Sequence, residues 1–481
     1  WRIIISAGTY QENVVIGPEH SGLTIQGLGW DVAVVDGGGN GPCIHADRWM
    51  DGTILGLKIT NGNSPTGGGG ILFSNGCSAL IIRNKIIGNT AVEGGAIASY
   101  SSTITVKDNY IEDNVAATQG GAILVVEGHA VTVEGNAISG NTASMGGGIR
   151  CWLSTGWITN NDIIGNAAPG GYGGGIFLTG SGFQVDQNVI TGNSAARGGG
   201  IFSWASSEPI EMNTISYNTA TLTGGGLSCE YFCNQAITYN TIWYNTAGYG
   251  GGVYLSDTEP VVFLANSLLE NTASVSGGGI CLSGRMSPRI GTSTLEEPAN
   301  DIAYNHAAED GGGIYVSQGG SPSVGLPTPF PYPYSNYLDH NSAGRFGGGI
   351  YCGQGSTPVI LNNAFWDNWA DAGGGICFVN SEASVGNGSI AGWNAINGNI
   401  ADTHGGGVFI TGVSMPSFHY NGFAFNVAYE GGGIYCDEGT TPHIRSSGLE
   451  FNEAVHGGGL RCVAASPTIE GSIFVWHNWA V

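Results

Sequence analysis

Three residues come closest to a set that could break a glycosidic bond: Glu296, Asp301 and Arg289. Two carboxyl groups about 5 to 10 Å apart suffice for hydrolysis, one as the acid and the other as base or nucleophile. Arginine would place a positive charge beside them. No motif fixes the spacing of these residues, and exposed acids are common on protein surfaces. We therefore predict no defined catalytic site and keep an enzyme as the alternative.

Aromatic residues near these acids could instead hold a ligand. Phe330, Tyr332 and Tyr334 lie in the proline-rich stretch GLPTPFPYPYSN, and Trp393 lies further along the chain. The prolines stiffen this stretch. Aromatic rings beside acids would suit a sugar chain or a protein neighbour. The alternative without function is an insertion that the surface simply tolerates.

A second aromatic series includes Tyr315 and Tyr351. Each member follows an aliphatic residue that comes directly after a glycine run, so we expect its ring to point outward from a strand. The full series is Phe177, Phe202, Tyr254, Tyr315, Tyr351, Phe409 and Tyr435. If exposed, these rings would form a stacking platform for glycans or for neighbouring molecules. The structural alternative is a ladder that only stabilises the sheet.

Acidic residues precede several of the glycine runs. They are Glu309, Asp310, Asp371, Asp402, Glu430 and Glu453, with His404 and His456 nearby. We expect a solvated acidic ridge, and calcium binding is the alternative. No Cys-x-x-Cys pair or Cys/His cluster indicates zinc, so we predict no cofactor. Among the ten cysteines, Cys436 and Cys462 occupy equivalent places in successive repeats and are candidates for a bridge.

The elements that must position these residues form one long repeat. The motif Gly-Gly-Ala-Ile at 94–97 recurs at 120–123, and the related Gly-Gly-Gly-Leu ends the series at 457–460. The period is about 26 residues, and each unit is made of short, β-branched pieces separated by turns. One such unit cannot bury its own apolar face, so the units must stack. The repeat therefore predicts an all-β protein, a right-handed parallel β-helix of about 17 coils.

A pair of asparagines five residues apart accompanies each repeat, as in Asn84 and Asn89. An amide at the same corner of every coil can bond to the amide of the next coil, which satisfies the buried polar groups along the stack. We predict this structural role for Asn89, Asn114, Asn141, Asn193, Asn245 and Asn271.

The whole chain, residues 1–481, is predicted to be a single β-helix domain. Residues 1–66 form the leading coils, and residues 67–481 carry the glycine and asparagine repeats. Three coils are longer than the others, with insertions near 291–301, 325–336 and 386–394. Because the coils stack in register, we expect these loops to project from one side.

A resemblance to known families supports this fold. The stretch AGTYQENVVI resembles the first strand of pectin methylesterases, and the GGA[ILV] and FxxN motifs resemble those of chlamydial polymorphic outer-membrane proteins. Nearly the whole chain is similar to bacterial right-handed parallel β-helix repeat proteins, a group that includes pectin lyase-like enzymes. The catalytic motifs that the resemblance would imply, such as DFIFG and GHG, do not occur in this sequence.

The composition limits the partners. The 481 residues include 86 glycines, and 36 acids against 13 bases give a formal net charge of −23. Such a surface repels nucleic acid and anionic membranes, because phosphate binding needs clustered Lys and Arg. No run of 18 apolar residues indicates a membrane span. The acidic, lysine-poor composition predicts an extracellular or cell-surface location.

The two ends of the chain, WRIIIS and SIFVWHNWAV, show no capping element. Unpaired strand edges at the end of a β-helix can pair with another chain. Either the sequence is a fragment of a longer chain, or these ends self-associate into filaments or a surface layer. We therefore predict a non-catalytic extracellular structural or adhesive protein. The alternatives are a polysaccharide lyase or glycoside hydrolase, and an adhesin that binds a polysaccharide.

Overall fold

The chain folds as a right-handed parallel β-helix, which confirms the predicted fold class. A computed structural model describes residues 1–258, 261–292, 298–326, 334–471 and 474–480. The strands of sheet A in these residues correspond to about 18 turns. Helical structure in the described residues is limited to two 3₁₀ turns, η1 (Pro18–His20) and η2 (Ile390–Gly392). Within the described residues, no helical segment could span a membrane.

Each full coil passes through four parallel sheets, named A to D here. One coil runs from β14 (Ile97–Tyr100) in sheet C to β15 (Thr103–Lys107) in sheet A, then to β16 (Tyr110–Glu112) in sheet B and β17 (Val115–Gln119) in sheet D. The next coil begins in register on sheet C, where Ile97 pairs with Ile123. Residues alternate in and out along each strand, and the inward aliphatic residues stack into a fully buried core.

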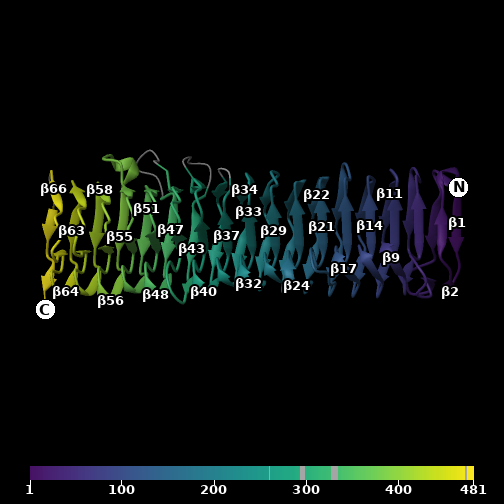
Figure 1. The fold of residues 1–481 in the computed structure, drawn as a ribbon, viewed down its shortest axis with the longest axis horizontal. Helices are drawn as coiled ribbons and strands as arrows, with labels where there is room; N and C mark the ends of the chain where they lie inside the picture. The colour runs from purple at the N-terminus through teal and green to yellow at the C-terminus, as the bar shows by residue number, and fades with distance from the viewer. Residues whose placement is uncertain (259–260, 293–297, 327–333, 472–473, 481) are drawn as a thin grey trace. The chain divides into compact units, whose positions relative to one another are not determined.

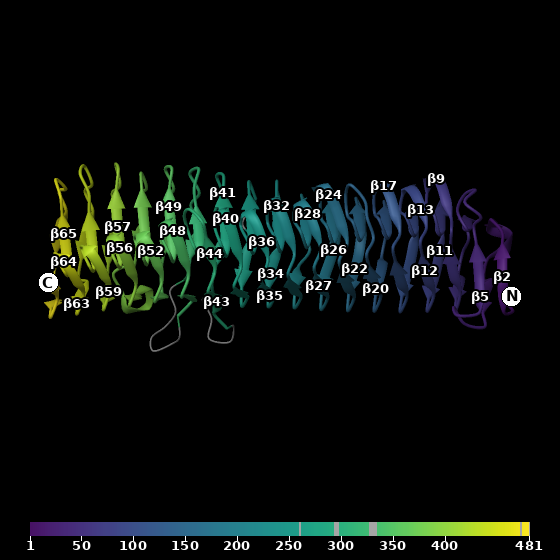
Figure 2. The ribbon, with the colours of Figure 1, turned by 90° about the horizontal axis from the view of Figure 1, so that it is seen from below.

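Two compact units divide the chain. Unit 1 contains residues 1–221 and 226–228, and unit 2 contains residues 222–225 and 229–481. Within each unit, Figure 1 shows successive coils side by side, and Figure 2 shows the same stacking after a quarter turn. Strands β32 (Thr219–Thr223) and β33 (Leu227–Glu230) contain residues of both units.

The strands of unit 1 follow the same order in every coil. Sheet A contains β1 (Arg2–Ile5), β4 (Thr24–Gly27), β7 (Gly52–Leu55), β11 (Ser78–Ile82), β15, β19 (Val131–Glu134), β22 (Thr155–Thr159), β26 (Gly182–Asp186) and β30 (Ile210–Glu211). Sheet B contains β2 (Gly8–Gln11), β5 (Ala33–Asp36), β8 (Lys58–Thr60), β12 (Lys85–Ile87), β16, β20 (Ala137–Ser139), β23 (Asp162–Ile164), β27 (Val189–Thr191) and β31 (Thr214–Ser216). Sheet C contains β3 (Val14–Ile16), β6 (Ile44–Asp47), β10 (Ile71–Ser74), β14, β18 (Ile123–Val126), β21 (Ile149–Trp152), β25 (Ile176–Thr179) and β29 (Ile201–Trp204). Sheet D contains β9 (Asn63–Gly67), β13 (Thr90–Glu93), β17, β24 (Ala167–Tyr172) and β28 (Ser194–Arg197).

Unit 2 repeats this order. Sheet A contains β34 (Ala236–Thr238), β38 (Val262–Leu264), β42 (Arg289–Ile290), β46 (Ser323–Val324), β50 (Val359–Ile360), β54 (Ser384–Val385), β58 (Ser417–His419), β62 (His443–Arg445) and β66 (Thr468–Glu470). Sheet B contains β35 (Thr241–Trp243), β39 (Ser267–Leu269), β43 (Asn300–Ala303), β47 (Asn336–Asp339), β51 (Asn363–Trp366), β55 (Asn394–Asn397), β59 (Asn421–Ala424), β63 (Gly448–Glu450) and β67 (Phe474–Trp476). Sheet C contains β37 (Val253–Ser256), β41 (Ile280–Ser283), β45 (Ile314–Val316), β49 (Ile350–Gly353), β53 (Ile376–Val379), β57 (Val408–Thr411), β61 (Ile434–Cys436) and β65 (Leu460–Cys462). Sheet D contains β36 (Thr246–Tyr249), β40 (Thr272–Ser276), β44 (His306–Ala307), β48 (Ser342–Phe346), β52 (Trp369–Ala372), β56 (Ile400–His404), β60 (Val427–Glu430), β64 (Glu453–His456) and β68 (Trp479–Ala480).

Two asparagine ladders flank sheet B in each unit. In unit 1, Asn114 donates both its backbone N–H and its Nδ2–H to Oδ1 of Asn141, each at 3.0 Å. In unit 2, Asn271 makes the same pair of bonds to Asn305, again at 3.0 Å. The six asparagines expected to have this role all lie in the ladders and are fully buried. From β12 to β59, the strands of sheet B are therefore held at both ends by ladder asparagines.

The three long coils of unit 2 place their extra residues at one turn. The insertions lie between β42 and β43, between β46 and β47, and between β54 and β55, so each connects sheet A to sheet B. The last insertion contains η2, whose ribbon stands out from the coils in Figure 1. The described residues of these insertions therefore border the outer face of sheet B.

Candidate functional site

The most distinctive surface of unit 2 is a cluster of four aromatic rings on the outer face of sheet B. Tyr334 occupies its centre, with ring centroids 5.8 Å from Tyr337, 5.9 Å from Trp366 and 6.0 Å from Trp393. Tyr337 and Trp366 also contact each other at 5.6 Å. All four side chains are partly exposed. Burial raises the pKa of Tyr334 to about 12, so its hydroxyl stays protonated and can donate a hydrogen bond.

The strands fix where these rings point. Tyr337 and Asp339 flank the inward Leu338 on β47, and Trp366 follows the inward Phe365 on β51. Residues on either side of an inward residue point outward. Because Asp339 pairs with Trp366 across the two strands, the aromatic rings and the carboxylate share one face.

Trp393 reaches this face from the third insertion. A Cβ atom at position 422 would lie 2.9 Å from Cζ2 of Trp393, so the glycine of β59 lets the ring pack closely on the strand. Trp393 also lines a depression of about 260 Å³, which Tyr420 and Glu450 border. Gly422, Ala424 and Gly448 leave room there because they have little or no side chain.

Two carboxylates lie beside the aromatic cluster. Asp301 on β43 pairs with Tyr337, and Ala303 pairs with Asp339, so the two acids are diagonal neighbours on adjacent strands. Asp301 is exposed at its tip, but partial burial and the nearby Asp339 carboxylate raise its pKa above the ordinary value. Two carboxyl groups in different environments, one of them with a raised pKa, are a suitable pair for proton transfer.

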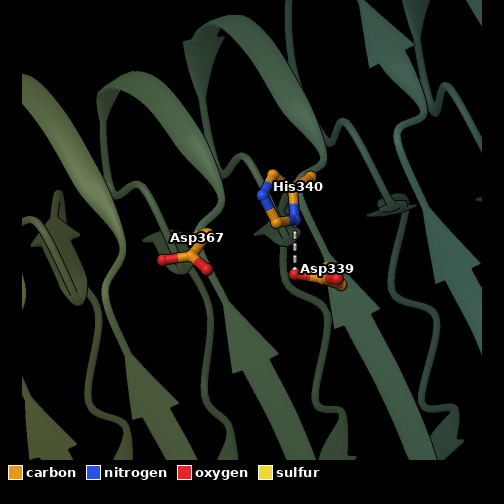
Figure 3. Close-up of side chains that lie close together, drawn as sticks. All are labelled: Asp339, His340 and Asp367. Carbon is orange, nitrogen blue, oxygen red and sulfur yellow. Dashed lines mark hydrogen bonds and ion pairs between the residues drawn. The ribbon is translucent and has the colours of Figure 1, made fainter.

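Asp339 also belongs to a cluster with His340 and Asp367 (Figure 3). Nδ1 of His340 lies 2.7 Å from Oδ1 of Asp339, and the imidazole ring stacks on Tyr304 with centroids 4.8 Å apart. One potential ligand atom from each of the three residues lies within 4.8 Å of the others. Three ligands are one fewer than a structural zinc site uses, so a cation bound here would need water to complete its coordination.

The structure brings together only part of the predicted site. Tyr334, Trp393 and Asp301 lie in or beside the aromatic cluster, whereas Arg289 lies on β42 in sheet A. Glu296, Phe330 and Tyr332 lie outside the described residues. Sequence reasoning missed Tyr337 and Trp366, although both hold outward positions between paired asparagines and could have been found by that alternation.

The structure favours the structural alternative, a ladder within the sheet, over an exposed platform around Tyr315 and Tyr351. These rings stack on each other with centroids 5.1 Å apart, but only 7% of the Tyr351 surface is exposed. Four other members of the series, Phe177, Phe202, Phe409 and Tyr435, are also buried. In some coils a large residue just before the glycine run covers these rings: Tyr172 packs on Phe202, and Phe346 packs on Phe409.

The acidic ridge is not uniformly solvated, which also corrects the expectation. Glu309, Asp402 and Glu453 are exposed, but Asp310 is only 6% exposed. Oδ2 of Asp310 lies 3.3 Å from Nη2 of Arg345, while Oδ1 has no hydrogen-bond partner among the described residues. Burial raises the pKa of Asp310 to about 6, although Arg345 acts in the opposite direction.

All ten cysteines are free, and nine of them are buried. Cys436 and Cys462 are direct register partners on β61 and β65. Because both are free, the candidate bridge between them is not formed in this structure.

A comparison with protein families supports the fold. The family model described as "Right handed beta helix region" matches residues 14–168 and 158–324. No curated protein has a significantly matching sequence.

Two kinds of polysaccharide-degrading enzyme appear among similar solved structures. One is the PL6 family alginate lyase AlyGC, at 11% identity and a TM-score of 0.25, with 98% of this chain and 97% of that chain covered. Another is the catalytic unit of a thermostable GH87 alpha-1,3-glucanase from Streptomyces thermodiastaticus strain HF3-3, at 12% identity and a TM-score of 0.17, with 99% and 64% covered. At such low scores no function is transferred from either enzyme.

Proposed function

The chain belongs to the right-handed β-helix family, and from this premise we propose that it is an extracellular, non-catalytic adhesive protein that binds polysaccharide on the outer face of sheet B in unit 2. The β-helix by itself does not determine a function, because one scaffold can carry many sites. The proposal therefore depends on the side chains of this face.

The aromatic cluster carries the proposal. Sugar rings have apolar faces that pack against Trp and Tyr, and their hydroxyl groups bond to nearby polar groups. Trp366 and Trp393 offer partly exposed indole rings, and Asp301 and Asp339 offer acceptors beside them. The depression of about 260 Å³ next to Trp393 adds space for part of a sugar chain.

Charge narrows the class of polysaccharide. Asp301, Asp339, Asp367 and Glu450 surround the aromatic rings, and the whole chain has a formal net charge of −23. An anionic polymer would be repelled at this face. We therefore expect a polysaccharide without carboxylate or sulfate groups.

Affinity electrophoresis through gels that contain different soluble polysaccharides tests the proposal. A neutral polysaccharide should retard the wild-type protein, and Trp393→Ala should weaken binding at least tenfold, because a buried aromatic contact of this kind contributes about 1.4 kcal/mol or more. Trp152→Ala removes an exposed tryptophan from β21 in unit 1 and serves as the matched control. Equal retardation of both variants, or none of the wild type by any polysaccharide, would refute the proposal.

Hydrolysis of the bound polysaccharide is a second candidate, which the Asp301 and Asp339 pair favours. Diagonal neighbours on adjacent strands are about 7 Å apart. That separation is typical of inverting glycosidases, which need room for a water molecule between the carboxyl groups. New reducing ends should then appear with inverted anomeric configuration, and Asp301→Asn should abolish them. If no bound polysaccharide released new reducing ends, hydrolysis would be refuted and the binding function would remain.

Association of chains through the ends of the β-helix also stays a prediction. Sedimentation velocity over a range of protein concentrations tests it: assembly increases the sedimentation coefficient with concentration, whereas a constant value contradicts it.

A further inference from the structure

A second depression in unit 2 lies at the turns that follow sheet B. It has a volume of about 450 Å³ and is lined by Tyr244, Glu270, Thr272 and Tyr304. Tyr244, Glu270 and Tyr304 occupy the same turn position in three successive coils, each with positive φ and each directly before a ladder asparagine. The depression is therefore built by the repeat and not by a single loop.

Where two adjacent coils both have a ring at this turn position, the two rings stack on each other. Tyr304 and His340 lie 4.8 Å apart, and Phe425 and Phe451 lie 5.1 Å apart. Tyr244 and Tyr304 are two coils apart, and the coil between them has no aromatic ring at this position. The two tyrosines are therefore separated by about 10 Å, which is twice the distance between stacked rings. Glu270 occupies the coil between them and supplies a carboxylate where the ring would be.

Two aromatic rings with a carboxylate between them are suited to a cation. A positive group midway between the two tyrosines would lie about 5 Å from each ring, within the roughly 6 Å range of cation–π attraction. The space is too wide for a flat guanidinium, which needs only about 3.5 to 4 Å on each side. A tetrahedral ammonium group on a sugar or alkyl carbon fills it better. Glu270 is exposed and has no ion pair among the described residues, so its charge is available.

We infer that this depression is a subsite for an ammonium group, and that the polysaccharide bound by unit 2 carries free amino groups, as a polymer of glucosamine does. This inference rests on the proposed function for the glycan and on the depression for the amine. The net charge of −23 supports it, because a cationic polymer is attracted to the protein from all sides.

Calorimetric titration with two matched oligosaccharides tests the inference. The probes are a hexamer of β-1,4-linked glucosamine and the corresponding fully N-acetylated hexamer, at a pH below the pKa of the sugar amine and above that of an ordinary carboxyl group. The glucosamine hexamer should bind about tenfold tighter, since the cation–π and carboxylate contacts together contribute roughly 1.4 kcal/mol or more. Added salt should reduce this preference.

Glu270→Gln should abolish the preference and leave binding of the N-acetylated hexamer unchanged. Glu438→Gln removes an equally exposed acid elsewhere in unit 2 and should preserve the preference. Tyr304→Leu should reduce the preference without removing the carboxylate.

Equal binding of both hexamers by the wild type, or a preference that survives Glu270→Gln, would overturn the ammonium subsite and leave the proposed function standing. Failure of the wild type to bind any glycan would overturn both.

Discussion

Asp310 is the residue whose environment most affects the pH dependence of stability. Its side chain lies beneath the glycine corner of unit 2, beside Arg345, with one carboxylate oxygen that no described residue bonds. Burial raises its pKa from 3.8 to about 6. The folded protein therefore binds a proton more tightly at this site than the unfolded chain does, and ionisation of Asp310 opposes folding.

Asp310→Asn should increase the free energy of unfolding at pH 7, and the increase should be smaller at pH 4. The stability that protonated Asp310 contributes is fully present below pH 3.8 and is lost as the pH rises through about 6. A pKa increase of this size corresponds to roughly 2 to 3 kcal/mol in the free energy of unfolding. Urea unfolding of both proteins at the two pH values measures the difference. Identical pH dependence in the wild type and the variant would show that Asp310 is solvated in the folded state.

At the residue scale, the contacts that could be predicted are those made by a residue type that recurs at the same position of the repeat. The bonds from Asn114 to Asn141 follow from one residue type that recurs at one corner of every coil, so the sequence was sufficient. The burial of Tyr351 was not predictable from strand alternation, which says only that the ring points away from the main core. What covers the ring depends on how the chain folds back before the glycines, and a two-residue period carries no information about that.

The glycine corner is the element that lets neighbouring coils approach. In unit 1, a Cβ atom at Gly147 would lie 2.5 Å from the carbonyl oxygen of Gly174 in the next coil. Gly165 has φ of +64°, but a Cβ atom there would meet nothing within 4 Å. The two glycines are therefore needed for different reasons, close packing in one case and backbone conformation in the other.

Gly147→Ala should lower the free energy of unfolding by about 2 to 3 kcal/mol, because the added methyl group forces two backbones apart. Gly165→Asp should change it by less than about 1 kcal/mol, since Asp tolerates positive φ and Asp113 already has this conformation at the equivalent turn. Urea unfolding of the two variants gives the comparison. A larger loss for Gly165→Asp would mean that the corner is not tightly packed.

At the element scale, the places of the insertions were predictable and their contacts were not. The length of each coil located the extra residues before the asparagine corner, where the structure has them between sheets A and B. The sequence could not show that Trp393 returns to pack on Gly422, because that contact joins an irregular loop to a strand of the next coil. The sequence therefore identified Tyr334 and Trp393 of the aromatic cluster through the insertions, whereas Tyr337 and Trp366 were identified only from the structure.

At the scale of the whole molecule, the repeat explains the fold but leaves the function open. The backbone groups of each coil form hydrogen bonds with the neighbouring coils. The recurring glycine, asparagine and inward aliphatic residues are therefore explained by the structure of the repeat. Function can be sought only where the repeat is broken. The clearest such breaks are the insertions of unit 2 and the ring missing at Glu270. The large acidic excess then restricts the ligand to an uncharged or cationic one.

The most direct test of the account is a crystal structure of the protein with a saturating oligosaccharide taken from the polysaccharide that it binds in solution. The account predicts a sugar ring packed on the indole of Trp366 or Trp393, with ring carbons about 4 Å apart, and hydroxyl groups bonded to Asp301 or Asp339. A ligand on another sheet, or in unit 1 with this face empty, would contradict it.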